Sequence, residues 1–282
     1  MAKNGKHGLV AGIDIGGTKL YTVIADEDGK VRGCGRKKTR AERGFKTVME
    51  RAVECALEAC ADAKVELKDL AAVGVGAPSA IREDGTAVKA CNLGWEDVPL
   101  VKTLEKLFGK PVFADNDCNV GTLGEFAYGA GRGAETVVGL FVGTGLGGGV
   151  VLRGELWRGK NRLATELGHT IVHPGGRKCN CGHQGCLEAY VAKVGMARRL
   201  THEILVQGRT SILTEHVEGS DYASLRSGIL AEAYRKKDAV VVETLHEAAD
   251  YLGIGVGNFI NTLGPEVVVL GGGVMEALGK DL

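Results

Sequence analysis

The amino-acid sequence predicts an α/β fold built from two related units. Short apolar strands alternate with amphipathic helices, which is typical of a largely parallel sheet. A strand, a glycine turn and a second strand occur near the N-terminus and again from residue 136. Hydrophobic residues make up 44% of the 282 residues, which is enough for a sizeable core. We therefore expect two domains.

The first unit begins with a predicted β-meander. Residues 9–15 (LVAGIDI) and 20–25 (LYTVIA) are short, branched and apolar, and a turn at 26–29 follows them. From Phe45 to Cys60, apolar side chains recur at the spacing of an amphipathic helix. After this helix, the pattern predicts a strand, a helix, a strand and a helix at residues 71–78, 100–108, 111–115 and 119–128.

The meander recurs at residues 136–157 (TVVGLFVGTGLGGGVVLRGELW). Aligning the two hairpins matches their apolar alternation and places Phe141 opposite Asp14. We interpret the repeat as a diverged internal duplication, in which two α/β units face each other across a cleft. Two unrelated hairpins are the alternative interpretation.

The rest of the chain is predicted to be mainly helical, with one late strand. The second of the two helical stretches is expected to break near Asp238. No low-complexity linker separates the units, so we expect the boundary at a hinge between elements. The helical stretches are 186–206 and 224–263, the strand is 267–273, and the predicted domains are 1–117 and 118–282.

Charge and composition exclude several classes of partner. Lys plus Arg equal Asp plus Glu at 35 each, so no net field attracts the chain to nucleic acid or to an anionic membrane. We find neither a signal peptide nor a stretch of about 18 apolar residues. We therefore expect a cytoplasmic protein that holds any phosphate by local geometry.

Three glycine-rich turns are candidate nucleotide sites. Residues 12–19 (GIDIGGTK) are not a P-loop, because a P-loop has Lys before Ser/Thr and continues as a helix. Residues 143–148 (GTGLGG) match a dinucleotide-binding pattern, but a strand follows them where that fold needs a helix. We interpret both as hairpins whose amides meet phosphate, with Asp14 holding Mg²⁺ through water. Purely structural turns are the alternative. The predicted nucleotide residues are Asp14, Gly16, Gly17, Thr18, Lys19, Gly143, Thr144, Gly145, Gly271, Gly272 and Gly273.

Residues 115–119 (DNDCN) place polar side chains between a predicted strand and a helix. Open α/β sheets bind their ligands at this end of the strands. A carboxylate at this position can accept the proton of an attacking sugar hydroxyl. Helix capping, at which Asp and Asn excel, explains the same residues equally well.

A cluster of cysteines predicts a metal site. Cys179, Cys181 and Cys186 lie within eight positions, and His169 is ten residues upstream. Three thiolates and one imidazole complete a tetrahedral structural zinc site, with buried free thiols as the alternative. The rival fourth ligands are His173 and His183.

Glu166 and Glu188 flank this cluster. Folding around zinc would fix both carboxylates near one point, where they can bind sugar hydroxyls. Each carboxylate taken alone is more often a solvated surface charge.

Together, DIGGTK, ADNDCN, VGTGLGGG, ELGH and CNCGHQGCLEAY resemble the ROK family, especially its bacterial glucokinase branch, from about residue 9 to 275. The resemblance implies a duplicated actin-like (ribonuclease H-like) ATPase fold that closes on hexose and ATP with Mg²⁺. It implies an ATP-dependent hexose kinase of glycolysis, above all a glucokinase acting on the 6-hydroxyl of glucose. It also implies a homodimer or homotetramer.

By matching position, the resemblance assigns roles to the candidate residues. Asp117 corresponds to the catalytic base. The implied sugar ligands are Asn116, Asp117, Glu166, His169 and Glu188. The implied zinc ligands are His169, Cys179, Cys181 and Cys186.

Two departures and two alternatives accompany the resemblance. Only about eight residues precede the first predicted strand, whereas ROK repressors carry a winged-helix domain there, so we expect no nucleic-acid partner. The chain also ends where the family usually continues, so its C-terminus is expected to be short. A kinase for N-acetylmannosamine, N-acetylglucosamine or fructose and a non-catalytic sugar sensor stay open as alternatives.

Overall fold

The computed structural model describes residues 8–217 and 222–281, and the chain divides into two compact units. Unit 1 extends to Gly124 and also includes Arg158–Ala164, whereas unit 2 contains Glu125–Trp157 and the chain from Thr165 onward. The sequence predicts a boundary between residues 117 and 118, but there the helix α3 (Asp117–Tyr128) is in its first turn. Because α3 is continuous, the change of unit falls inside it.

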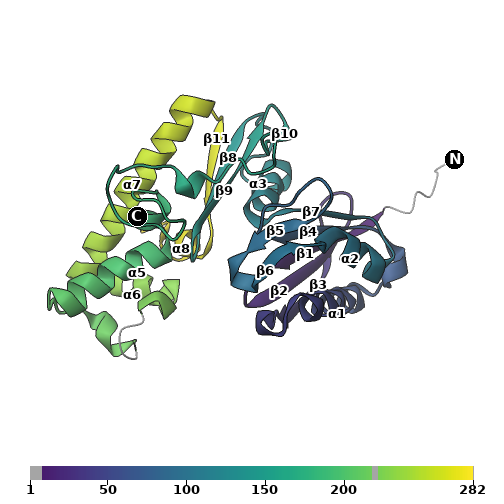
Figure 1. Ribbon diagram of the computed structural model, residues 1–282, viewed down its shortest axis with the longest axis horizontal. Coiled ribbons are helices and arrows are strands. Elements are labelled where there is room, and N and C mark those ends of the chain that lie inside the picture. The colour runs from purple at the N-terminus through teal and green to yellow at the C-terminus, as the bar shows by residue number, and fades with distance from the viewer. Residues whose placement is uncertain (1–7, 218–221, 282) are drawn as a thin grey trace. The chain divides into compact units, whose positions relative to one another are not determined.

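Unit 1 is built on a five-stranded sheet in the order β3-β2-β1-β4-β7 (Figure 1). β2 pairs antiparallel with β1 and β3, while β4 pairs parallel with β1 and β7. A small β5-β6 hairpin completes the unit. The elements are β1 (Leu9–Ile15), β2 (Lys19–Ala25), β3 (Val31–Lys38), α1 (Phe45–Ala63), β4 (Leu70–Ala77), β5 (Ala87–Ala90), β6 (Trp95–Val98), α2 (Leu100–Phe108) and β7 (Val112–Asn116).

Helix α1 packs directly on the antiparallel strands of unit 1. Its apolar stripe, including Val48, Met49 and Ala52, is fully buried in the core of this unit. A Cβ atom at Gly35 of β3 would lie 2.3 Å from the carbonyl oxygen of Cys55, so only glycine permits this approach. The amphipathic helix predicted from Phe45 is confirmed.

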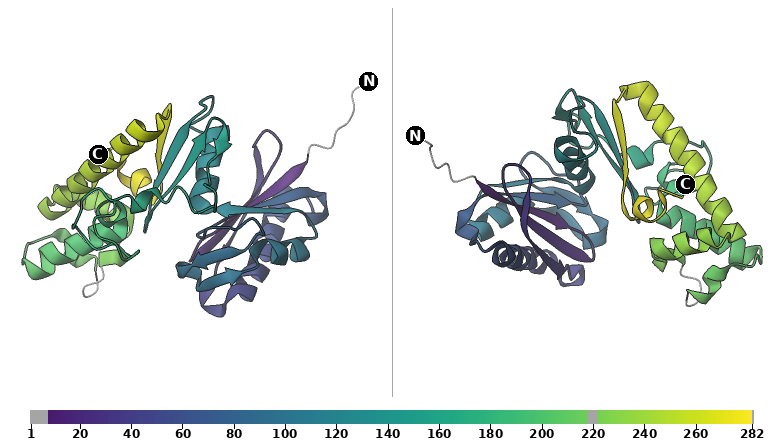
Figure 2. Two further views of the ribbon diagram at one scale, coloured as in Figure 1. Left: turned by 45° about the horizontal axis from the view of Figure 1, so that its top comes forward. Right: turned by 180° about the vertical axis from the view of Figure 1, so that it is seen from behind.

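Unit 2 is built on a four-stranded sheet in the order β10-β9-β8-β11. The long helix α7 lies along one face of this sheet (Figure 2). Asp238 accepts a hydrogen bond from the N–H of Val241 and so caps α7, which explains the predicted break. The elements are β8 (Val137–Val142), β9 (Leu146–Leu152), β10 (Glu155–Leu156), α4 (Glu188–Val191), α5 (Lys193–Thr201), a π-helical turn (His202–Val206), α6 (Ser227–Arg235), α7 (Ala239–Leu263), β11 (Val267–Gly271) and α8 (Gly273–Leu278).

The two sheets repeat one topology. In each, a three-stranded antiparallel meander is joined to a parallel strand on the far side of its first strand. Phe141 pairs with Gly271 on β11, just as Asp14 pairs with Gly76 on β4. This agreement supports the predicted internal duplication. None of the described helices combines the length and apolar character needed to cross a bilayer.

Glu266 fixes the start of β11 against the segment that leads into β8. Its Oε2 accepts the N–H of Thr136 at 2.9 Å and the N–H of Glu135 at 2.5 Å, and these two bonds lower the pKa of Glu266. Because the folded-state pKa is depressed, this stabilisation is present above the ordinary glutamate value and is lost as the pH falls through the folded-state value.

We therefore expect the free energy of unfolding of Glu266→Gln to fall less on acidification than that of the parent chain. Urea unfolding midpoints between about pH 5 and pH 3 measure this loss, because the ordinary glutamate pKa is ~4.3. Glu276→Gln, on α8, is the matched control and should behave like the parent chain. If the urea midpoints of Glu266→Gln and of the parent chain fall by the same amount between these pH values, the assignment is contradicted.

Candidate active site

The first glycine hairpin connects β1 to β2 through a turn that admits little but glycine. A Cβ atom at Gly16 would lie 2.9 Å from the carbonyl oxygen of Lys19, and one at Gly17 would lie 3.1 Å from Cβ of Asn92. Thr39, which is fully buried, donates through Oγ1 to the carbonyl of Gly16 at 2.6 Å. The buried hydroxyl of Thr39 thus fixes the backbone of the turn. The side chains of Thr18 and Lys19 are exposed and available to a ligand.

Asp14 and Asp117 lie close together at the carboxyl ends of β1 and β7. Asp14 is opposite Gly76 of β4, and a Cβ atom at Gly76 would lie only 3.5 Å from Cα of Asp117. Because Gly76 has no side chain, nothing from β4 separates the two carboxylates. Asp14 is exposed, yet reduced hydration and, second, the negative charge of Asp117 raise its pKa.

Asn116 and Asp117 play different parts at the start of α3. Oδ1 of Asn116 accepts the N–H groups of Cys118 at 2.9 Å and Asn119 at 3.2 Å, so the capping interpretation holds for Asn116. The Asn116 NH₂ group is left as a donor. Asp117 accepts only through Oδ1, from the Cys118 N–H at 2.9 Å, and its Oδ2 accepts no hydrogen bond within the described part of the chain. One oxygen of Asp117 is therefore open to a substrate proton.

Asp115 has a role that the sequence does not reveal. Its carboxylate is buried, accepts from Nδ2 of Asn119 at 3.0 Å, and forms ion pairs with Nε of Arg158 and, at 3.3 Å, with Arg162. Arg162 also donates to the carbonyl of Ile81 at 2.8 Å. Asp115 therefore joins the start of α3 to the segment Arg158–Ala164. Its two arginine partners lie more than 40 residues away in sequence, where no local pattern identifies them.

The second glycine hairpin, between β8 and β9, is fixed by Glu188. The N–H of Leu146 donates to Oε2 of Glu188 at 3.0 Å, and a Cβ atom at Gly145 would lie 2.7 Å from the same oxygen. The carbonyls of Gly143 and Thr144 accept N–H groups from the start of α5 at 3.1 and 3.2 Å. A side chain at position 145 would therefore displace the carboxylate of Glu188 from the N–H of Leu146.

The predicted zinc ligands converge. The ligand atoms of His169, Cys179, Cys181 and Cys186 all lie within 4.8 Å of one another. Sγ of Cys181 and Sγ of Cys186 are 3.6 Å apart, and Sγ of Cys179 is 3.7 Å from Nδ1 of His169. A tetrahedral zinc with Zn–S bonds of about 2.3 Å and a Zn–N bond of about 2.0–2.1 Å requires separations of about 3.8 Å and 3.6 Å, respectively. The four residues therefore fit zinc.

The thiols of this cluster are electrostatically unequal. Burial raises the pKa of Cys179 to about 12, with further contributions from the Cys181 thiol and Glu188, and burial likewise raises the pKa of Cys186. Burial opposes ionisation of Cys181 too, but hydrogen bonds from His183 and from the other two thiols lower its pKa to about 6. A thiolate beside two thiols is suited to a cation that replaces their protons.

The two rival histidines make other contacts. Nδ1 of His173 is 2.6 Å from the hydroxyl of Tyr251, and its ring stacks on Tyr190. Nδ1 of His183 is 3.5 Å from Sγ of Cys181, but His183 is not among the four residues that converge. His169 is therefore the histidine that the geometry favours.

The two candidate sugar carboxylates differ in their surroundings. Glu188 is half-buried and contacts both the hairpin, through Leu146, and Sγ of Cys179, at 3.3 Å from Oε1. Glu166 is exposed and its carboxylate has no partner in the described ranges. Thr165, directly before it, has a φ of 72°, a conformation that is strained for a β-branched residue.

The segment after Glu166 is pressed onto β9. A Cβ atom at Gly168 would lie 2.0 Å from the carbonyl oxygen of Leu146, and one at Gly148 would lie 2.7 Å from Cδ1 of Leu167. These close approaches hold His169 and Glu166 at fixed places in unit 2. They also explain why glycines occur at 148 and 168.

The third glycine run ends β11. A Cβ atom at Gly271 would lie 2.9 Å from the ring of Phe141, and one at Gly272 would lie 2.6 Å from the carbonyl oxygen of Val142. Gly272 also has a φ of 89°, which favours glycine. Packing against β8 thus accounts for Gly271 and Gly272, whereas a Cβ atom at Gly273 would meet only Oγ of Ser227 at 3.9 Å.

Comparison with known proteins gives consistent results. The chain is 37% identical over 268 residues to a glucokinase of Thermotoga maritima, with 94% of this chain and 82% of that protein covered. It is 34% identical to a glucokinase of Halalkalibacterium halodurans, with 94% and 80% covered.

Two solved structures extend the comparison. The ROK family glucokinase of Streptomyces griseus, in complex with glucose and AMPPNP, matches with a TM-score of 0.81 and 29% identity over 97% of this chain and 88% of that chain. The ROK hexokinase of Thermus thermophilus matches with a TM-score of 0.77 and 33% identity over 96% and 87%. These likenesses confirm the predicted actin-like ATPase fold. Since a profile of the ROK family matches residues 10–279, the chain belongs to the ROK family.

Proposed function

We propose that this protein is an ATP-dependent hexose kinase, and specifically a glucokinase that phosphorylates the 6-hydroxyl of glucose. One observation carries the proposal: Asp117 keeps one carboxylate oxygen open and lies beside Asp14, with only Gly76 between them. A base and a metal-binding carboxylate side by side are what phosphoryl transfer requires. Glucokinases are also among the relatives that match nearly the whole chain.

In the proposed reaction, Oδ2 of Asp117 accepts the proton of the 6-hydroxyl as that oxygen attacks the γ-phosphorus of ATP. The new bond joins O6 to phosphorus, the bond to the β–γ bridging oxygen breaks, and ADP leaves. Mg²⁺, when bound, neutralises charge on the phosphates, and Asp14 is the residue that would hold it through water. The two glycine hairpins would receive phosphate on their amides.

The proposed sugar ligands are Asn116, Asp117, Glu166, His169 and Glu188. The NH₂ group of Asn116, whose Oδ1 already accepts at the start of α3, would donate to a hydroxyl, while Asp117 acts as the base. In unit 2 Glu166 and Glu188 would accept from hydroxyls. With Nδ1 of His169 directed at the cysteines, its Nε2 is left for the sugar.

Zinc is proposed as a structural ion held by His169, Cys179, Cys181 and Cys186. When bound, it would link the loop 179–186 to His169 and so fix the carboxylate of Glu188. We further propose a cytoplasmic enzyme of glycolysis that forms a homodimer or homotetramer and has no nucleic-acid partner.

A coupled assay of ADP release against a panel of sugars tests this function. We expect glucose to give the highest kcat/KM, above fructose, N-acetylglucosamine and N-acetylmannosamine, in the presence of ATP and Mg²⁺. A higher kcat/KM for another sugar would reassign the substrate. Sugar binding without any ADP release would replace the kinase by a sensor.

A further inference from the structure

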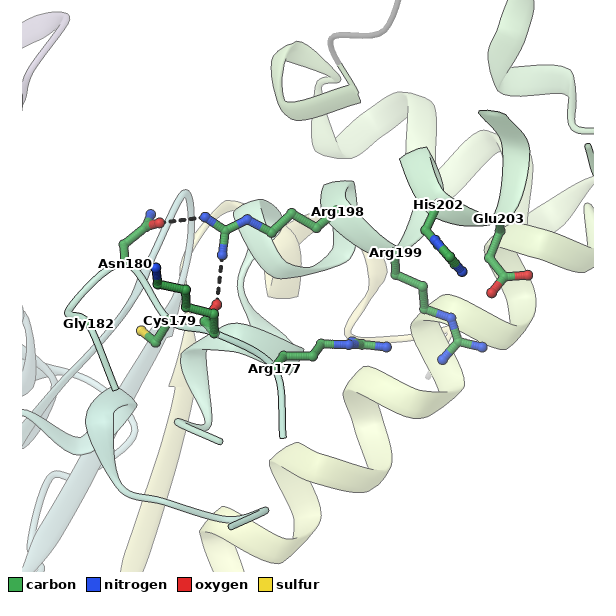
Figure 3. A pocket seen from close by; sticks show the side chains of 9 residues that line it. Arg177, Cys179, Asn180, Gly182, Arg198, Arg199, His202 and Glu203 are labelled. Carbon is green, nitrogen blue, oxygen red and sulfur yellow. Dashed lines mark hydrogen bonds between the residues drawn. The ribbon is translucent and has the colours of Figure 1, made fainter. Parts of the chain in front are cut away.

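Unit 2 contains a strongly basic cavity beside the cysteine loop. Its volume is about 790 Å³, and the guanidinium groups of Arg177, Arg198 and Arg199 border it together with His202 and Glu203 (Figure 3). Lys178 lines it as well, and Glu203 is the one acidic residue of the lining. The proposed sugar ligands Glu166, His169 and Glu188 do not line it. Cys179, one of the proposed zinc ligands, does line it, so the cavity adjoins the cysteine cluster but differs from the proposed sugar site.

The positive charge of the cavity is only partly neutralised. Arg177 and Arg199 share a single carboxylate, Glu247, at 2.8 and 2.6 Å. Nη1 of Arg177 and Nε of Arg199 are buried and find no acceptor in the described ranges. These two atoms are covered by the protein, so they add positive charge beside the cavity without being open to a ligand themselves. Glu203 does not neutralise this charge, because it pairs with Arg209 at 3.0 Å.

Neither Arg198 nor Lys178 pairs with a carboxylate in the part of the chain that the structure describes. Arg198 donates to neutral acceptors only, the carbonyl of Lys178 at 2.8 Å and Oδ1 of Asn180 at 2.6 Å (Figure 3). The ammonium group of Lys178 is exposed and forms no ion pair within residues 8–217 and 222–281. The chain as a whole is neutral, so this concentration of cations is not a by-product of a basic surface.

We propose that this cavity binds a phosphate monoester. Guanidinium groups match the geometry of phosphate oxygens, and an ammonium group adds a mobile charge. The cavity is much larger than a phosphate group and leaves room for an organic part such as a sugar. Arg198 donates to the carbonyl of Lys178, the residue before Cys179, so a phosphate bound to Arg198 would be linked indirectly to the loop that carries the cysteines.

Isothermal titration calorimetry at low ionic strength tests the proposal on the full zinc-loaded chain. The probes are inorganic phosphate and glucose 6-phosphate, each titrated in the presence of saturating glucose so that the sugar site is blocked. Both should bind, and Lys178→Gln should weaken each by about tenfold, the usual effect of one lost charge-assisted hydrogen bond. Because no hydrogen bond or ion pair joins the Lys178 side chain to any of the described residues, its replacement should leave the fold intact.

The controls separate the ligand source and the kinase function. Tighter binding of glucose 6-phosphate identifies a sugar phosphate as the ligand, and equal binding identifies the phosphate group itself. Arg226→Gln removes one exposed cation of the same unit outside the cavity and should leave both affinities unchanged. Absence of binding, or equal binding by Lys178→Gln and the parent, overturns the proposal. ADP release is measured separately, so the kinase assignment stands or fails independently.

Discussion

Replacing Asp117 by Asn is expected to lower kcat by about 10³-fold while the KM for glucose changes by about twofold or less. The amide cannot accept the proton of the 6-hydroxyl. Its carbonyl oxygen can still accept the Cys118 N–H, so the start of α3 should survive the change. Steady-state kinetics with glucose and ATP, together with a thermal melt of each protein, measure the two effects.

The matched control for this substitution is Asp250→Asn, on the exposed face of α7. It removes the same charge from the other unit and should keep full activity. Turnover of Asp117→Asn near the parent value would remove Asp117 from the mechanism. A large rise in KM with unchanged kcat would instead assign Asp117 to sugar binding alone.

Loss of one zinc ligand is expected to have the second large effect. Cys181→Ser should reduce the zinc content from about one equivalent to almost none, since three ligands hold zinc poorly. Loss of a structural metal is among the largest single-site effects, on the order of 4–5 kcal/mol, or a fall of about 10 °C or more in Tm. Elemental analysis and calorimetric melting give both quantities.

Cys34→Ser provides the comparison, because Cys34 is also exposed but lies in β3 outside the cluster. It should retain the metal and the melting temperature of the parent chain. A metal-free protein that is fully folded and active would show that the loop needs no zinc.

Much of the framework could be predicted because its signals are local. The first strand was expected at residues 9–15 and is β1, and the helices expected at 45–60 and 100–108 correspond to α1 and α2. Apolar periodicity and turn residues determine such elements over a few neighbours. The convergence of His169 with the three cysteines could be predicted for a similar reason, since the cysteines lie within eight positions of one another.

The features that sequence reasoning missed depend on contacts between distant segments. In the sequence, Asp115 is not distinguished from the other polar residues of DNDCN. Its ion pairs with Arg158 and Arg162 are visible only in the folded structure. The hydrogen bond from the N–H of Leu146 to Glu188 joins residues 42 positions apart. Glu188, predicted as a sugar ligand, therefore also fixes the β8–β9 hairpin. Sequence patterns record which residues are present but not which remote segments share a surface.

The passage of Arg158–Ala164 into unit 1 has a practical consequence for anyone who wishes to dissect the chain. A fragment that stops at Gly124 would retain the buried Asp115 carboxylate and lose both of its arginine partners. Such a fragment should be poorly soluble unless the segment is grafted back or Asp115 is replaced by an uncharged residue. To separate the two units for a gene fusion or a split reporter, the chain therefore has to be divided at more than one position, because unit 1 contains two separate segments.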